Sequence, residues 1–175
     1  MVRLFTCVWI PEDMKRNIIK FQEKMSTLGM DAKFVEKENL HLTITFLGEV
    51  EDVSSIKNSL VNIKGFGQFP VRLSGLKIIP STNYIRVIGI NVKDQGKFSL
   101  LIKTVGSMIG GDYHDEAKMT LCRVKNIKNK QKVLSFIEEN KNIDFGEFVV
   151  KKVYLVRSDL TPNGPVYTTI FEVDL

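Results

Sequence analysis

The spacing of apolar residues predicts a chain of alternating strands and helices. One apolar stripe recurs every three or four residues after Pro11, the period that places side chains on one face of an α-helix. Its members are Met14, Ile18, Phe21, Met25 and Leu28. Pro11 is typical of the start of a helix and Gly29 of its end. We therefore expect a helix from Glu12 to about Leu28.

The segment Leu40–Leu47 alternates between apolar and polar residues, which is typical of a β-strand with one buried face. On one face lie Leu40, Leu42, Ile44 and Phe46. His41 and Thr43 share the opposite face. We therefore predict that Phe46 lies in the core with its apolar neighbours, and that Trp9 does so at the end of the first strand.

The remaining pattern predicts further strands and helices in a repeating order. Strands are expected at Arg3–Ile10, Ala32–Val35, Phe69–Ile79, Ile85–Val92, Ala117–Val124, Phe148–Val156 and Val166–Val173, and helices at Val53–Ile63, Phe98–Ile109 and Val133–Asn140. The order strand, helix, strand, helix, strand thus occurs twice at a spacing of about 80 residues, which is too long for a solenoid repeat. We predict a single domain, residues 1–175, made of two pseudo-repeats at about 1–83 and 84–175.

Composition and charge narrow the class of protein. The 175 residues are 43% hydrophobic and 26% charged, which excludes a largely disordered chain, a collagen-like chain and a disulfide scaffold. No apolar run reaches the roughly 18–20 residues of a membrane span, so no membrane segment is expected. The net charge of +5 favours an anionic partner such as a phosphate-rich ligand without identifying one.

The two cysteines indicate a cytoplasmic protein. Cys7 and Cys122 lie inside apolar stretches, and neither has the spacing of a zinc site. Reduced core cysteines are therefore expected. The first strand lacks a small-residue cleavage site and ends at Pro11, so it does not resemble a signal peptide. We expect a monomer.

A histidine and a threonine on one strand are the first candidates for chemistry. His41 and Thr43 are two residues apart, roughly 6.5 Å along a strand, so they would reach one ligand together. An imidazole exchanges protons near neutral pH, and a hydroxyl can hold a phosphoryl oxygen. Alone, such a pair is typical of an exposed strand surface.

The matched strand of the second repeat offers a similar pair. Lys118 and Thr120 occupy the places of His41 and Thr43 in the segment KMTLCRVK. Arg123 follows three residues on and carries a forked cation suited to phosphate. Two such strands predict a symmetric clamp for an anion.

These segments resemble the paired motifs of the two-histidine phosphoesterases, and within them the RNA 2',3'-cyclic phosphodiesterases, also called 2'-5' RNA ligases. The opening RLFTCVWIPEDMK, the segment FVEKENLHLTITFLGEV and the closing VYLVRSDLTPNGPVYTTIFEVDL resemble the family as well, so the likeness covers nearly the whole chain. It implies an α+β fold with two pseudo-symmetric lobes, whose antiparallel sheets are flanked by helices around a central groove.

The resemblance also implies an activity. Family members hydrolyse the 2',3'-cyclic phosphate ends of RNA to 2'-phosphates without metal or nucleotide cofactor, and some join tRNA halves through 2'-5' linkages. One histidine activates water, the other protonates the leaving ribose oxygen, and two threonines hold the phosphate. This implies a catalytic His41 and substrate binding by Thr43, Thr120, Arg123 and Tyr167, with RNA ends as partner. Tyr113 is a further candidate to stack on a ribose or base.

The chain departs from the family where the second histidine is expected, because Lys118 stands there. A free lysine titrates near pH 10.4 and is a poor base at neutral pH, unless burial or a nearby cation lowers its pKa. As a cation it can stabilise charge that builds on phosphorus. The other histidine, His114, lies roughly 13 Å along an extended strand from Lys118, so we predict a loop residue without a catalytic role.

Three outcomes therefore remain open at the sequence level. The first is an active enzyme in which His41 is the acid–base group and Lys118 binds phosphate. The second is a weakened enzyme, because losing one acid–base group typically costs about 10²–10⁴-fold in rate. The third is an RNA-end or nucleotide-binding protein without turnover. A generic interaction domain with an incidental groove is disfavoured by the paired motifs.

Overall fold

The structure, a computed structural model, describes residues 1–113 and 116–175, and for Lys118 the backbone alone. His114 therefore lies outside the described residues. The strands are β1 (Val2–Trp9), β2 (Met30–Phe34), β3 (His41–Val50), β4 (Phe69–Ser81), β5 (Tyr84–Lys93), β6 (Lys118–Ile127), β7 (Asp144–Val150), β8 (Lys152–Thr161) and β9 (Gly164–Asp174). The helices are α1 (Glu12–Ser26), α2 (Val53–Leu60), α3 (Lys97–Ile109) and α4 (Lys130–Glu139), with short 3-10 turns at Lys37–Asn39 and Val61–Ile63.

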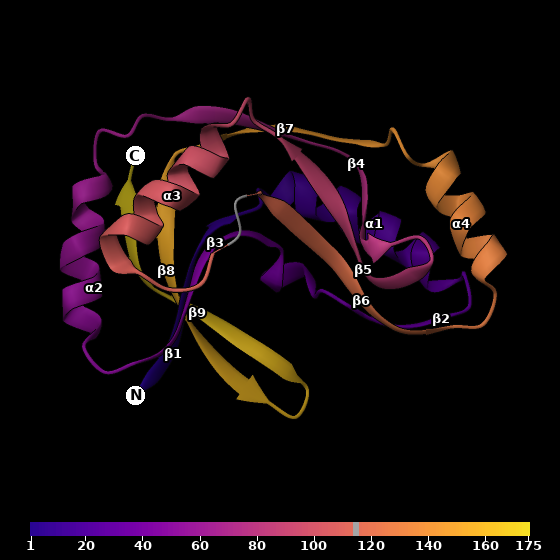
Figure 1. Cartoon of the computed structure of the whole chain (residues 1–175), viewed down its shortest axis with the longest axis horizontal. Coiled ribbons are helices and arrows are strands. Elements are labelled where there is room, and N and C mark those ends of the chain that lie inside the picture. Colours follow the sequence, from indigo (N-terminus) through magenta and orange to yellow (C-terminus); the bar gives the residue numbers. More distant parts are fainter. Residues whose placement is uncertain (114–115) are drawn as a thin grey trace.

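Two antiparallel sheets form the body of the molecule (Figure 1). The four-stranded sheet has the order β3-β1-β8-β9, and the five-stranded sheet has the order β2-β6-β5-β4-β7. The order β3-β1-β8 in one sheet matches β6-β5-β4 in the other, which confirms the predicted α+β architecture with two related lobes. Each sheet draws strands from both halves of the chain, so the sheets do not follow the boundary near residue 83. That the two halves are pseudo-repeats stays a prediction.

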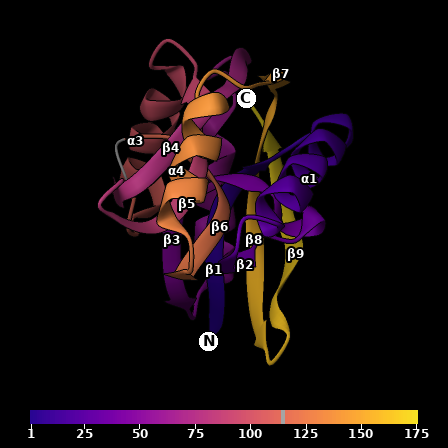
Figure 2. The same ribbon diagram turned by 90° about the vertical axis from the view of Figure 1, so that its right-hand side faces the viewer.

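Helices cover the outer side of each sheet. Helix α1 packs against β2 and β7 of the five-stranded sheet. Helix α3 packs against β3 of the four-stranded sheet, and α2 packs against α3. The apolar stripe predicted for α1 is buried throughout, from Met14 to Leu28, so this helix and its buried face are confirmed. No helix in the described part of the chain is long and apolar enough to cross a membrane. The β8–β9 hairpin projects from the body of the molecule in both ribbon views (Figures 1 and 2).

The single strand predicted at Phe148–Val156 is wrong. The chain instead forms β7 and β8, which are separated at Lys151 and belong to different sheets. Val150 and Val153 on the two sides of the break are both fully buried. The apolar pattern therefore continues while the chain crosses from one sheet to the other, and no glycine or proline marks the crossing.

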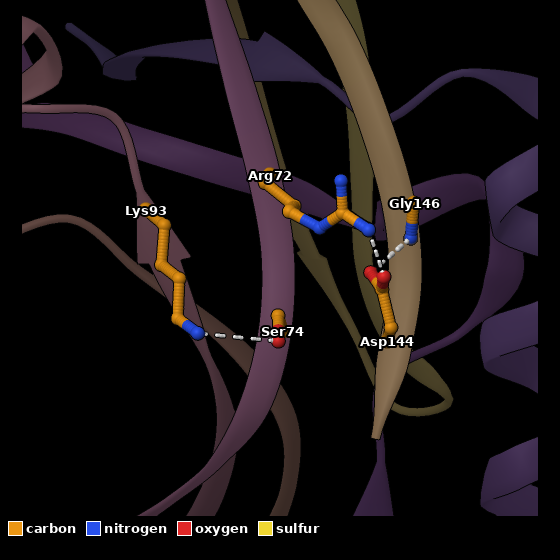
Figure 3. A network of polar contacts seen from close by, with 5 residues as sticks. All are labelled: Arg72, Ser74, Lys93, Asp144 and Gly146. Carbon is orange, nitrogen blue, oxygen red and sulfur yellow. Dashed lines mark hydrogen bonds and ion pairs between the residues drawn. The ribbon is translucent and has the colours of Figure 1, made fainter. Parts of the chain in front are cut away.

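Polar contacts tie the edge strand β7 to its neighbour β4 (Figure 3). Arg72 of β4 forms an ion pair with Asp144 of β7, and the same carboxylate accepts a hydrogen bond of 3.0 Å from the backbone amide of Gly146. On the other side of β4, Lys93 donates to Ser74 at 3.4 Å. The ion pair between Arg72 and Asp144 is exposed to solvent, so it adds little to the stability of the edge.

Each of the two motif strands contains a β-bulge directly after its threonine. In the pairing of β1 with β3, Thr43 and Thr45 lie opposite consecutive partners, so Ile44 is the extra residue. In the pairing of β5 with β6, Thr120 and Cys122 lie opposite consecutive partners, so Leu121 is the extra residue. One extra residue reverses the alternation of a strand. The side chain three positions after each threonine therefore returns to the threonine's face.

This reversal explains why the prediction for Phe46 is wrong. Phe46 is three residues after Thr43, pairs with Phe5 and is 47% exposed, whereas its expected companions Leu42 and Ile44 are buried. The matched position in the other sheet is Arg123. The two bulges thus place Phe46 and Arg123 on the groove-facing sides of their sheets.

Candidate active site

A cavity of about 510 Å³ lies between the two sheets. Strands β3 and β6, far apart in the sequence, approach each other there (Figure 1). The structure brings together five of the six predicted site residues in its lining: His41, Thr43, Thr120, Arg123 and Tyr167. The sixth is Lys118, whose backbone lies in β6 opposite Asn91 and two residues before Thr120.

Hydrogen bonds define the tautomer of His41. Its Nδ1 lies 2.6 Å from the backbone oxygen of Asn39, and its Nε2 lies 3.0 Å from Thr43 Oγ1. A carbonyl oxygen can only accept, so Nδ1 carries the proton and donates it. In the neutral ring, Nε2 then accepts from the Thr43 hydroxyl. The basic nitrogen of His41 therefore lies beside Thr43 on the groove side of β3.

Aromatic rings hold the imidazole on its other sides. The ring centroids of Phe5, Trp9 and Tyr167 lie 5.1, 5.7 and 5.6 Å from that of His41. The Trp9 indole N–H donates to Thr169 Oγ1 at 3.1 Å, which fixes that ring. Trp9 is partly buried and packs against the small buried cluster of Phe5, Cys7 and Val156, so its predicted place in the core is confirmed only in part. Its indole N–H requires a polar partner, which β9, two strands away in the same sheet, supplies.

This environment lowers the pKa of His41. Burial among the rings disfavours the charged imidazolium and is the largest cause. The hydrogen bond to Asn39 acts in the opposite direction, and the positive charge of Lys15 lowers the pKa further. Lys15 lies over the Trp9 ring, with its ammonium 5.5 Å from the ring centroid. The neutral imidazole, with an unprotonated Nε2, is therefore the dominant form at neutral pH.

We expect His41 to titrate below the ordinary histidine value, as followed by the NMR shifts of its ring against pH. A Lys15→Met variant should raise the midpoint, because removing a nearby cation makes protonation less costly. An Arg16→Met variant, with an exposed cation on the same helix, should leave it in place. A midpoint for His41 at or above the ordinary value would contradict this account of its surroundings.

Asn39 is a buried residue that sequence reasoning missed. Its backbone oxygen accepts from His41, and its side-chain amide donates to the backbone oxygen of Pro165 at 3.0 Å. It thereby joins the imidazole to the start of β9, which carries Tyr167. In the sequence, Asn39 lies in a polar turn, and such residues are usually exposed. Only its position just before the motif could have drawn attention to it.

Gln22 of α1 supports the bulge in β6, and sequence reasoning missed it as well. The backbone oxygen of Leu121 accepts from Gln22 Nε2 and from the backbone amide of Val35, each at 2.9 Å. Gln22 Nε2 also donates to the backbone oxygen of Val35 at 3.0 Å. The amide is only 5% exposed. The signal available in the sequence was a polar glutamine within the apolar stripe of this helix, four residues after Ile18.

Exposed aromatic residues border the other end of the cavity. Phe46 and Asp112 exchange backbone hydrogen bonds of 2.7 and 2.8 Å, which attach the segment before β6 to β3. Thr45 Oγ1 lies 3.2 Å from the backbone oxygens of both Gly110 and Asp112. Tyr113 follows this bridge and is 45% exposed in the cavity lining. Both rings therefore present an open face at the groove.

Comparisons with known proteins agree with this fold and site. A family model described as LigT-like phosphoesterase matches residues 8–89. The chain is 38% identical to a Methanocaldococcus jannaschii protein named RNA 2',3'-cyclic phosphodiesterase, with 98% of this chain and 99% of that protein covered. A Methanothermobacter thermautotrophicus protein of the same name is 32% identical, with 95% of each chain covered.

A solved structure shares the fold over nearly its whole length. The crystal structure of the Thermus thermophilus protein TT0787 superposes with a TM-score of 0.78 at 27% identity, covering 99% of this chain and 97% of that one. The two sheets, the paired motifs and these relatives define a two-histidine phosphoesterase. The chain belongs to the LigT-like phosphoesterase family.

Proposed function

We propose that this chain is an RNA 2',3'-cyclic phosphodiesterase, a hydrolase that opens cyclic phosphate ends of RNA to 2'-phosphates. The observation that supports it most directly is the geometry of His41, whose unprotonated Nε2 and the Thr43 hydroxyl share the groove with Thr120 and Arg123. The names of the relatives that match nearly the whole chain support the same activity.

The proposed reaction uses His41 twice. Its Nε2 takes a proton from a water molecule, and the resulting hydroxide attacks phosphorus. The bond between phosphorus and the ribose 3'-oxygen breaks, and its electron pair stays on that oxygen. The imidazolium then returns the proton to the 3'-oxygen, which leaves a 2'-phosphate and a 3'-hydroxyl. The hydrogen bond from Nδ1 to Asn39 stabilises the protonated ring between these steps.

The remaining site residues bind the phosphate in this proposal. The hydroxyls of Thr43 and Thr120 donate to the non-bridging oxygens, and the Arg123 guanidinium supplies positive charge from β6. Lys118 supplies a second cation that stabilises charge on the pentacoordinate phosphorus. Tyr167 packs its ring against His41 and borders the space for the terminal ribose.

Position 118 favours one alternative function. A lysine with an ordinary pKa is charged at neutral pH and cannot act as the second acid–base group. A protein that keeps the clamp but not the turnover would bind RNA ends without converting them. The alternative thus predicts salt-dependent binding of cyclic phosphate ends and no product.

Hydrolysis of a short RNA with a 2',3'-cyclic phosphate end, in the presence of EDTA, tests the proposal. We expect the unmodified protein to form the 2'-phosphate. A Lys118→His variant should be faster, by as much as about 100-fold, because it gains a second acid–base group. A Lys118→Arg variant keeps the fixed cation and should remain active, whereas a lysine acting as a base could not be replaced in this way.

Each result of this assay has a defined meaning. Turnover by the histidine variant alone would establish the binding alternative, and turnover by none of the three proteins would refute the proposed activity. If the Lys118→Arg variant were inactive while the unmodified protein and the Lys118→His variant were active, the proposed electrostatic role of Lys118 would be wrong. Addition of a second RNA with a free 5'-hydroxyl to the same reaction tests for the 2'-5' joining that the family resemblance implies.

A further inference from the structure

We infer that Lys33 and Arg123 form a second anion subsite, which binds the phosphodiester joining the terminal nucleotide to the rest of the RNA. This inference rests on the proposed function and extends it, because it assigns a contact beyond the reacting phosphate. It predicts that the enzyme prefers the end of an oligonucleotide over a cyclic mononucleotide.

The two cations lie side by side on neighbouring strands. Lys33 of β2 is the register partner of Arg123 of β6, so both side chains leave the same face of the five-stranded sheet. Directly opposite residues in antiparallel strands have Cβ atoms about 4.5–5.5 Å apart. Both residues are exposed to solvent, and both line the cavity that contains His41.

This arrangement is unfavourable unless an anion lies between the cations. Like charges directly opposite each other in a sheet are destabilising. Within residues 1–113 and 116–175, neither Lys33 nor Arg123 takes part in an ion pair. Glu36 is a carboxylate of the cavity lining that lies with Lys33 beside Gly164, and it accepts from Asn39 at 3.5 Å. One carboxylate beside two cations leaves positive charge for a phosphate to neutralise.

Lys33 reaches across the groove to the β8–β9 hairpin. Its Nζ lies 3.2 Å from the point where a Cβ on Gly164 would stand, and Glu36 Oε1 lies 3.4 Å from the same point. Gly164 has φ +135° and no side chain, so it leaves room for the ammonium beside the turn at the tip of the hairpin. The Lys33 ammonium therefore closes one end of the cavity, between β2 and the turn that precedes Tyr167.

The position of Lys33 separates it from the reacting phosphate. The threonines of β3 and β6, together with Arg123, already surround the space beside His41. Lys33 lies on the next strand outward, about 4.8 Å farther across the sheet. The next anionic group that a bound RNA presents after its terminal phosphate is the phosphodiester on the 5' side of the last nucleotide. Arg123 lies between the two positions and can contact both groups.

The test compares three substrates: 2',3'-cyclic AMP, a dinucleotide with a 2',3'-cyclic phosphate end, and the same dinucleotide with an uncharged methylphosphonate linkage. For the unmodified protein, we expect kcat/KM for the charged dinucleotide to exceed that for the mononucleotide by about tenfold, the value of one charge-assisted contact. A Lys33→Gln variant should lose this preference. A Lys103→Gln variant removes another exposed charge, from α3 and outside the cavity, and should retain the preference.

The methylphosphonate substrate makes the assignment specific. With the unmodified protein, kcat/KM for the methylphosphonate dinucleotide should be about tenfold lower than for the charged dinucleotide. With the Lys33→Gln variant, the two dinucleotides should have equal kcat/KM, because each change removes one partner of the same contact. Equal preference ratios in the unmodified protein and the Lys33→Gln variant would overturn the subsite. The subsite would also be overturned if the Lys33→Gln substitution and the methylphosphonate linkage each lowered kcat/KM independently of the other.

Failure of the proposed function gives a different pattern. In that case the unmodified protein would hydrolyse none of the three substrates. Binding of the fluorescently labelled dinucleotides, followed by anisotropy, would then decide the subsite alone. A difference of about tenfold in Kd between the charged and uncharged linkages, abolished by Lys33→Gln, would support it. Equal Kd values for the two linkages would refute it.

Discussion

A His41→Ala variant is expected to form 2'-phosphate at least about 100-fold more slowly than the unmodified protein. One general acid–base group contributes about 10²–10⁴-fold to the rate, and in the proposed reaction His41 serves as both base and acid. Its Nε2 has no equivalent among the other predicted site residues whose side chains the structure describes, since Thr43, Thr120 and Tyr167 carry hydroxyls that are weak bases at neutral pH and Arg123 carries a cation. The measurement is the initial rate of product formation from a short RNA with a cyclic phosphate end.

The control for this experiment is the second histidine of the chain. A His114→Ala variant removes the same side chain from a position predicted to have no catalytic role, so its rate should match that of the unmodified protein. Circular dichroism and the thermal midpoint check that both variants fold. If His41→Ala retained full activity, the assignment of the acid–base group would be wrong. If His114→Ala also lost activity, the two histidines would act together.

A Gln22→Met variant is expected to lower the free energy of unfolding by about 2–3 kcal/mol. Methionine keeps the length of the side chain but cannot donate to the backbone oxygens of Val35 and Leu121, which the amide of Gln22 contacts. The Leu121 oxygen keeps the backbone amide of Val35 as a donor, whereas the loss of both side-chain hydrogen bonds, including the donor to the Val35 oxygen, costs about 2–3 kcal/mol in sum. Urea denaturation followed by circular dichroism measures the change.

An exposed position on the same helix supplies the control for Gln22. An Asn17→Met variant replaces a polar residue on the solvent side of α1, and its stability should stay within about 0.5 kcal/mol of the unmodified protein. Because Gln22 supports the bulge between Thr120 and Arg123, its replacement should also raise KM for the RNA end. Equal stabilities of the two variants would show that the contacts of Gln22 contribute nothing to the fold.

The parts of the fold that follow from side-chain period alone were predictable. The helix α1 is one example, because apolar residues at spacings of three and four residues lie on one face of an α-helix, where they can be buried together. His41 and Thr43 are another, because residues two apart on a strand share a face. The distance of 3.0 Å between His41 Nε2 and Thr43 Oγ1 confirms that the two side chains share a face.

The errors arise where the backbone departs from a regular period. Phe46 was placed in the core because alternation was assumed to continue through Ile44, whereas a bulge depends on the partner strand and leaves no local trace. The crossing from β7 to β8 was missed because buried valines continue on both sides of it. Asn39 depends on a contact with Pro165, more than a hundred residues away in sequence, and no local pattern encodes such a contact.

The paired bulges have a consequence for how this site diverges among gene copies. Each bulge is one residue long, so the next groove-facing side chain lies three residues after the threonine instead of two. Loss of the single codon for Ile44 would remove this bulge and one buried side chain, while Thr43, Thr45 and Phe46 could keep their partners on β1. Phe46 would then lie two residues after Thr43 in a regular strand, so it would stay on the groove side. Alignments of related chains should therefore match the residues after a one-residue gap at either bulge to Phe46 or Arg123, because the groove-facing side chain is unchanged by the gap.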